Sequence, residues 1–360
     1  MRILRIYPTL PPYAGGLEQH VVRLSEAQRR LNMHVTIAYN YGAASAHSDV
    51  QVGGHAAIHR LRPQALRDVV FYCWAAIRLA RMRVRADVVH LHGDWSAFIC
   101  GRLLARVVGA KVLVASVHDR LREGRIWDCV YGLVLREFHL CYSTGQHDAR
   151  RLAQVARRET SWITSGLHPI FQHTAEVTSA PVRVAKVDVI TVATLTAKKR
   201  VDFVLEIAKL MPFVRFMIVG DGPERGRLED LLRKHSVDNV EFCGRLNVDE
   251  VHAAYHSSRI FLLTSASEGT PTAILEAMAC GLPIVTSASN DFSQLLEDEV
   301  TGYVVDSPDP RHYAERIIAL LSDKRLLEEI GETNRLRARR FAWPAIAQRI
   351  TSAMEAAVRS

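Results

Sequence analysis

The sequence has no long apolar segment and no closely spaced cysteine pair. No run approaches the roughly 20 uncharged apolar residues that a membrane-spanning helix needs, and a strand-like segment, Arg2–Tyr7, stands where a signal peptide would. We therefore expect a cytoplasmic protein. The six cysteines show no Cys-x-x-Cys spacing, so they resemble small buried hydrophobic residues in a reducing compartment rather than a disulfide framework or a zinc site.

Recognisable nucleic-acid modules are absent as well, although the chain carries a formal net charge of +8. Residues 1–170 hold 23 Lys and Arg against 12 Asp and Glu, whereas residues 171–360 hold 23 against 26. Neither an RNP aromatic signature nor a zinc-finger spacing accompanies the basic half, so we expect no nucleic-acid partner. The charge instead favours a phosphorylated ligand or peripheral association with the inner face of an anionic membrane.

Short β-branched runs alternate with segments of helical period along the whole chain, which is typical of parallel sheets covered by helices. An amphipathic helix over residues 18–31 separates the first two predicted strands. In the first half we predict strands at 2–7, 34–39, 87–92, 111–117 and 160–164. In the second half we predict strands at 187–193, 215–219, 240–243, 260–264, 283–286 and 303–305. The pattern indicates an α/β protein of two doubly wound, Rossmann-like domains facing a central cleft.

We place the N-terminal domain at residues 1–170 and the C-terminal domain at 171–345, with a final helix over 346–360 packing back toward the N-terminal domain. The polar, proline-bounded stretch 172–181 is expected to be the linker.

The most informative segment runs from Ser267 to Pro283. Thr270 is a suitable N-cap and Pro271 a suitable first helical residue, so we predict a helix that ends near Gly281. The amides at its N-terminus would suit a diphosphate or sugar hydroxyls.

Two carboxylates, Glu268 and Glu276, bracket this turn. Each carboxylate can accept hydrogen bonds from both hydroxyls of a vicinal diol. Taken alone, the pair is equally compatible with two solvated glutamates.

The segment resembles the signature of the GT-B glycosyltransferases of family 4, two glutamates separated by seven residues in E-G-x-x-x-x-x-x-E-A-M-A-x-G-x-P. The matching positions are Glu268, Gly269, Glu276, Ala277, Met278, Ala279, Gly281 and Pro283. Further blocks follow in the family's order at 15–16, 219–223, 242–246 and 301–305, so the resemblance covers almost the whole chain. It implies a retaining hexosyltransferase that uses a UDP- or GDP-sugar, without a cofactor or a metal.

The resemblance also implies roles for individual residues. Glu276 is expected to hold the donor ribose, Glu268 to lie beside the transferred sugar, and His118 to face that sugar from the N-terminal, acceptor-binding domain. A histidine satisfied by the backbone is the alternative for His118. The other expected donor contacts are Gly15, Gly16, Lys199, Arg245, Gly269, Thr270, Thr272 and Ala273. On the acceptor side we expect Tyr13, His92 and Asp119.

Two positions depart from the family pattern. Thr194 stands where the family has an arginine that grips the diphosphate, so Lys198, Arg200 or a residue elsewhere has to supply the missing charge. Pro271 stands where many members have glycine and has no N–H to offer a donor.

Two other features have a simpler alternative. His90, His92 and Asp94 could form a metal site, but no further ligand is evident and we expect none. The aromatic and arginine-rich segment 69–85 is compatible with core packing beside a solvated basic edge, or with a helix on a membrane surface.

We therefore expect an enzyme that transfers a hexosyl group to a glycan, lipid-linked or small-molecule acceptor in bacterial polysaccharide or glycoconjugate biosynthesis. A sugar-nucleotide epimerase of the same fold is the enzymatic alternative. A non-catalytic protein that binds sugar nucleotides as the partner of an enzyme is the other alternative, because Thr194 lacks the usual charge.

Overall fold

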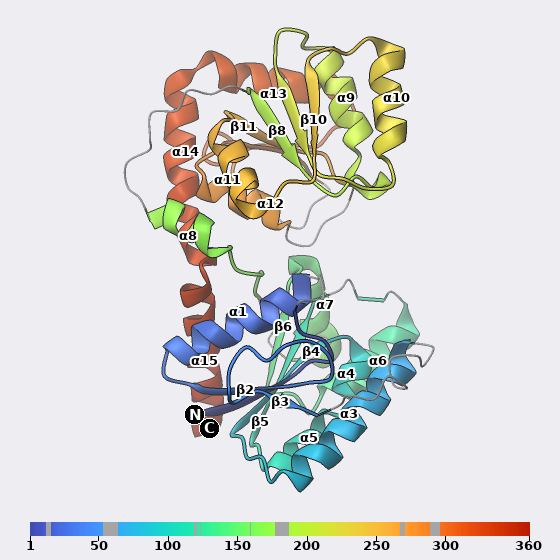
Figure 1. The fold of residues 1–360 in the computed structure, drawn as a ribbon, viewed down its shortest axis with the longest axis vertical. Helices are drawn as coiled ribbons and strands as arrows, with labels where there is room; N and C mark the ends of the chain where they lie inside the picture. Colours follow the sequence, from blue (N-terminus) through green and yellow to red (C-terminus); the bar gives the residue numbers. More distant parts are fainter. Residues whose placement is uncertain are drawn as a thin grey trace. The chain divides into compact units, whose positions relative to one another are not determined.

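The computed structural model describes residues 1–11, 16–52, 64–118, 121–122, 124–158, 160–176, 187–266, 271–288 and 296–360. The chain divides into two compact units, residues 1–166 with 343–360, and residues 167–342 (Figure 1). These divisions lie a few residues from the boundaries that the sequence suggested, because α8 (Pro169–Glu176) belongs to the second unit and α15 (Trp343–Arg359) to the first.

The N-terminal unit contains a parallel seven-stranded sheet of order β3-β2-β1-β4-β5-β6-β7. Its strands are β1 (Arg2–Ile6), β2 (His34–Tyr39), β3 (Val50–Gln51), β4 (Val88–Gly93), β5 (Val112–Val117), β6 (Leu140–Ser143) and β7 (Thr160–Trp162). The five strands predicted in this half are present. The strands β3 and β6 were not predicted, because they are short and their residues show little periodicity.

Helices cover both faces of this sheet (Figure 1). The helices are α1 (Gly16–Arg30), α3 (Gln64–Arg81), α4 (Trp95–Phe98), α5 (Gly101–Val108), α6 (Arg125–Leu135) and α7 (Gln146–Ala156). On one face, α1 packs against α15, where Leu24 and Ile350 lie in one buried cluster. On the other face, α3, α5 and α6 bury side chains such as Leu79 and Leu104.

The C-terminal unit has a parallel six-stranded sheet of order β10-β9-β8-β11-β12-β13. Its strands are β8 (Val189–Val192), β9 (Phe216–Val219), β10 (Val240–Gly244), β11 (Ile260–Leu263), β12 (Ile284–Ser287) and β13 (Gly302–Val305). The helices, besides α8, are α9 (Val201–Lys209), α10 (Arg225–His235), α11 (Val248–His256), α12 (Thr272–Ala279), α13 (Pro310–Ser322) and α14 (Lys324–Ala338). Two parallel sheets interleaved with helices confirm the predicted α/β architecture of two Rossmann-like domains.

The predicted linker needs correction. Residues 172–176 belong to α8, and only the stretch beyond them lies outside the described residues. Phe171 is fully buried, with its ring 5.9 Å from that of Tyr255, so apolar packing holds this helix on the C-terminal unit.

The helix predicted between Thr270 and Gly281 begins one residue later than expected. The helix α12 begins at Thr272, and Pro271 precedes it in an extended conformation with φ −69° and ψ 115°. Pro271 is thus the N-cap residue rather than the first helical residue. Thr270, the predicted cap, lies outside the described residues.

The aromatic residues of α3 belong to the core. Phe71 and Tyr72 are each only 1% exposed, so they cannot insert into a membrane interface. The sequence periodicity was compatible with both locations, and the structure supports the core alternative for these two rings.

Candidate active site

A cavity of about 770 Å³ in the C-terminal unit opens at the carboxyl ends of β8, β9 and β10 and at the start of α12. Strand order reverses between β8 and β11, and doubly wound sheets bind ligands at such a reversal. The predicted donor residues that line this cavity are Lys199, Arg245, Thr272, Ala273 and Glu276.

Six further predicted site residues lie outside the part of the chain that the structure describes. These residues are Tyr13, Gly15, Asp119, Glu268, Gly269 and Thr270. Gly16 is the first residue of α1.

Two cationic side chains line the cavity within the described part of the chain, Lys199 and Arg245. Lys199 ends a short 3-10 turn (Ala197–Lys199), and Arg245 directly follows β10. Arg200, a candidate replacement for the missing arginine, instead lies over the ring of Phe203 at 4.7 Å. Arg245 therefore supplies the second positive charge of this cavity, beside Lys199, because Thr194 carries none.

A glycine at the end of β9 allows two chain segments to meet at the cavity. Gly220 has φ +137°, and a β-carbon there would lie 1.9 Å from the carbonyl oxygen of Ala193. Only glycine avoids this collision. The turn at Gly220 is thus a tight structural turn that brings Thr194 and Asp221 to the same cavity.

Glu276 is half-buried and contacts Tyr255 from α11. The Tyr255 hydroxyl lies 3.3 Å from Glu276 Oε2 and 3.2 Å from the Ala273 carbonyl oxygen, as a donor to either. Burial raises the pKa of Glu276 to about 7, and the hydrogen bond from Tyr255 opposes this only in part. A ligand that donates hydroxyl hydrogens to Glu276 would therefore stabilise its ionised form.

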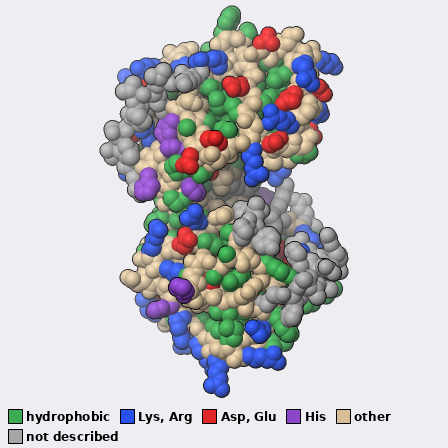
Figure 2. All heavy atoms as spheres, in the orientation of Figure 1, with side chains coloured by type: hydrophobic (Ala, Val, Ile, Leu, Met, Phe, Trp, Pro, Cys, Tyr) green, Lys and Arg blue, Asp and Glu red, His purple; other side chains and the backbone are tan. Residues whose placement is uncertain are grey.

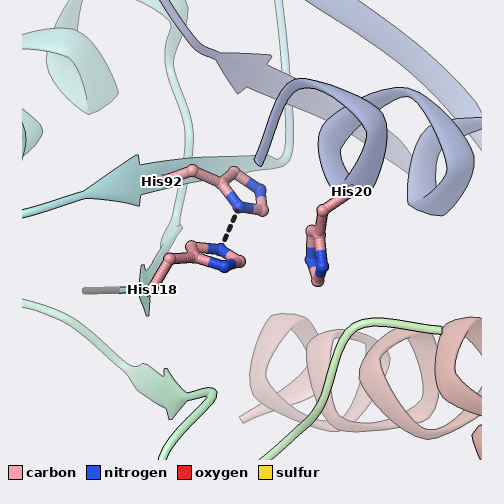
Figure 3. A group of neighbouring side chains, drawn as sticks. All are labelled: His20, His92 and His118. Carbon is pink, nitrogen blue, oxygen red and sulfur yellow. Dashed lines mark hydrogen bonds between the residues drawn. The ribbon is translucent and has the colours of Figure 1, made fainter. Parts of the chain in front are cut away.

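Three histidines of the N-terminal unit form a cluster (Figure 3). His118 directly follows β5, His92 lies in β4 and His20 in α1. His92 Nδ1 and His118 Nε2 are 3.0 Å apart, and the ring of His20 stands edge-on to that of His118 with 4.5 Å between centroids. Burial lowers the pKa of His118 to about 3 and holds those of His20 and His92 well below the usual range. All three rings are therefore neutral at physiological pH.

A second cavity, of about 500 Å³, lies in the N-terminal unit where strand order reverses between β1 and β4. His92 lines it, together with Trp95 and the carboxylates of Asp68 and Asp94. Ser96 Oγ donates to Asp68 at 3.2 Å, and burial raises the pKa of Asp68. Carboxylates beside an indole ring suit a polyhydroxylated ligand.

Sequence reasoning missed several of these residues. Arg5 contacts His92 at 3.1 Å, and its only signal was a charged residue between the apolar residues Leu4 and Ile6 of a predicted strand. Neither His20 nor Tyr255 stands in a motif, so nothing in the linear pattern singled them out.

The family of the chain follows from comparison with known proteins. Residues 14–167 match the model described as Glycosyltransferase Family 4, and residues 178–337 match the one described as Glycosyl transferases group 1. The chain belongs to the GT-B glycosyltransferases of group 1, as its sequence motifs suggested, and is a glycosyltransferase.

Particular relatives extend the match over the chain. The Arabidopsis thaliana phosphatidylinositol N-acetylglucosaminyltransferase subunit is 27% identical over 368 residues, which cover 97% of this chain and 80% of that protein. N-acetyl-alpha-D-glucosaminyl L-malate synthase of Bacillus anthracis is 34% identical over 141 residues, 38% of this chain and 36% of that protein. The crystal structure of Anabaena HepE in complex with UDP superposes with a TM-score of 0.74 at 19% identity, covering 99% of this chain and 100% of that one.

Within the described residues, no helix has the length and apolar composition needed to cross a membrane.

Proposed function

We propose that the protein transfers a hexosyl group from a UDP- or GDP-sugar to an acceptor bound by the N-terminal unit, with retention of anomeric configuration. One observation carries the donor assignment. A single cavity combines two cations, the start of a helix and the half-buried carboxylate of Glu276. This combination matches the two polar parts of a nucleotide-sugar, its diphosphate and its ribose diol. The UDP bound by Anabaena HepE is consistent with this choice.

The diphosphate is assigned to Lys199, Arg245 and the amides of Thr272 and Ala273, which occupy the first turn of α12. The amide N–H groups in the first turn of a helix have no carbonyl partner within that helix, so they can donate to a ligand, and the helix dipole favours an anion there. Negative charge on the diphosphate grows as the glycosidic bond breaks, so these groups stabilise the transition state more than the bound substrate.

In the proposed mechanism the leaving diphosphate receives the acceptor proton, and no covalent enzyme intermediate forms. His118 and Glu268 position the transferred sugar and stabilise developing charge. Because protein cations neutralise the diphosphate, the mechanism needs no divalent metal and no cofactor.

The acceptor is assigned to the cavity of the N-terminal unit. Asp94 accepts hydrogen bonds from the Trp95 amide at 2.7 Å and from the Tyr131 hydroxyl, so its position is well defined. Its carboxylate and that of Asp68 can hold sugar-like hydroxyls, while Trp95 packs against a ring face. A glycan or the polar head of a lipid-linked acceptor fits this chemistry, in polysaccharide or glycoconjugate biosynthesis.

Peripheral membrane association is part of this proposal. Exposed apolar side chains of the N-terminal unit include Ile126 at 78% and Leu133 at 67%, both on α6. Figure 2 shows basic side chains gathered on the N-terminal unit near exposed hydrophobic ones. Apolar contact together with attraction to anionic headgroups would bring the enzyme to a lipid-linked acceptor.

Donor hydrolysis by the purified protein tests the proposal. Slow release of free sugar and nucleoside diphosphate is expected from one sugar nucleotide of a panel, and that donor should also raise the melting temperature. An epimerised product would identify an epimerase instead. Binding without any turnover, in the presence of candidate acceptors as well, would identify a non-catalytic binding protein.

A further inference from the structure

An arginine lies at the centre of the N-terminal sheet. Arg5 is fully buried in β1, and burial lowers its pKa to about 9, so it keeps its charge at neutral pH. Its guanidinium contacts His92 Nε2 at 3.1 Å, His90 Nδ1 at 3.2 Å, Gln28 Oε1 at 2.7 Å and Ser25 Oγ at 2.5 Å. None of the hydrogen-bond partners that the described residues provide for Arg5 is a carboxylate.

The direction of these hydrogen bonds follows from chemistry. A guanidinium has five N–H donors and no acceptor, so His92 Nε2 must accept from Arg5. A neutral imidazole carries one proton, which for His92 is then on Nδ1. His92 Nδ1 is 3.0 Å from His118 Nε2 (Figure 3). His92 Nδ1 is therefore the donor in this contact, which leaves the single proton of His118 on Nδ1.

His90 obeys the same rule. Its Nδ1 accepts from Arg5, so its proton lies on Nε2, where Ser116 Oγ is 2.7 Å away as the acceptor. One arginine thereby determines the hydrogen-bond polarity of two neighbouring rings, and of a third through His92.

We propose that Arg5 is a positioning residue which, through His92, fixes His118 in the tautomer that carries its proton on Nδ1. His118 then offers an N–H donor, not an acceptor, to an oxygen of the transferred sugar. The identity of that oxygen rests on the proposed function, whereas the tautomer rests only on the contacts of Arg5.

The same contacts argue against a metal site. The ligand atoms of His20, His92 and His118 lie within 4.8 Å of one another, which would suit a metal ion on distance alone. A metal needs a lone pair on each ligand nitrogen, but the donor from Arg5 places a proton on His92 Nδ1. The guanidinium charge beside His92 would also repel a cation.

The test is the ring-nitrogen NMR spectrum of the histidine-labelled full-length protein, in which the two neutral tautomers give distinct nitrogen shifts. In the wild type we expect the proton of His118 on Nδ1 and that of His90 on Nε2. The signals are assigned with His118→Asn and His90→Gln. A proton on Nε2 of His118 would overturn the proposal, and this measurement needs no change at the buried arginine.

A matched pair of variants separates polarity from packing. Arg5→Lys keeps a side chain that only donates, whereas Arg5→Met has similar length and donates nothing. We expect Arg5→Lys to retain the wild-type His118 tautomer, and Arg5→Met to release it and to lower kcat roughly five- to tenfold, as for one lost hydrogen bond. An unchanged His118 tautomer in folded Arg5→Met would contradict the proposal. Altered nitrogen shifts of His20, His92 and His118 when equimolar zinc is added to the wild type would also contradict it. If the wild type shows the expected tautomers but turns over no sugar nucleotide, the proposed function fails and the assignment of Arg5 stands.

Discussion

Lowering the pH from 8 to 6 should weaken donor binding about tenfold through Glu276. Burial raises the pKa of this carboxyl to about 7 in the unliganded protein. In the proposed complex, the ribose hydroxyls donate to the ionised form and lower that pKa. Affinity is therefore nearly complete at pH 8 and is lost progressively as the carboxyl becomes protonated on lowering the pH through 7.

The magnitude follows from proton linkage. The apparent Kd is multiplied by one plus the ratio of protonated to ionised carboxyl, a factor of about 11 at pH 6 and about 1.1 at pH 8 for a pKa near 7. Calorimetry with an intact nucleotide-sugar is the suitable assay. A free nucleoside diphosphate has a terminal phosphate that titrates in the same range and would obscure the effect.

Two variants control this measurement. Glu276→Gln cannot ionise, so its affinity should be weaker and nearly constant across this pH range. Glu328→Gln, at a surface glutamate of α14 whose side chain is 66% exposed, should keep the wild-type pH dependence. The reasoning is refuted if Glu276→Gln retains the tenfold change or if the wild type shows none.

Lys199→Ala should lower the turnover number, because it removes about 2–4 kcal/mol of transition-state stabilisation. Near-normal turnover at saturating donor would show that Lys199 does not bind the diphosphate. Glu276→Gln should chiefly raise the donor KM, because the ribose does not change during transfer. Without ligand at pH 8, the same variant should have a free energy of unfolding higher than that of the wild type by on the order of 1–3 kcal/mol, and so a higher melting temperature. The sign follows from proton linkage, because the pKa of Glu276 is higher in the folded protein than its ordinary value. The wild type therefore loses stability as the pH rises from that ordinary value to about 7, and the variant does not. A lower melting temperature for Glu276→Gln would disprove this reasoning. Activity should survive excess EDTA, whereas loss restored by a divalent ion would contradict metal independence. Binding to anionic vesicles should weaken as salt is added and when Ile126 is replaced in Ile126→Glu. The control Phe213→Ser, at a 97% exposed position of the other unit, should leave this binding unchanged. Equal binding to neutral vesicles would reject the membrane proposal.

Local sequence pattern was sufficient for the architecture and for several residues that line the cavity of the C-terminal unit. Strands and helices follow from apolar periodicity and from breakers, which act over a few residues. The signature segment follows β11 and combines the start of α12 with the carboxylate of Glu276, so its linear spacing already predicts a ligand site. Short elements such as β3 escaped detection, and proline at 271 suits both an N-cap and a first helical residue.

The remaining features depend on strand order and burial, which no local pattern determines. Arg5 and His92 lie 87 residues apart and meet because β1 and β4 are neighbours in the sheet. Likewise, Arg245 reaches the cavity of Lys199 only because β10 and β8 end at the same edge. The raised pKa of Glu276 and the neutral histidines are consequences of desolvation, which exists only once the tertiary structure has removed water from these groups.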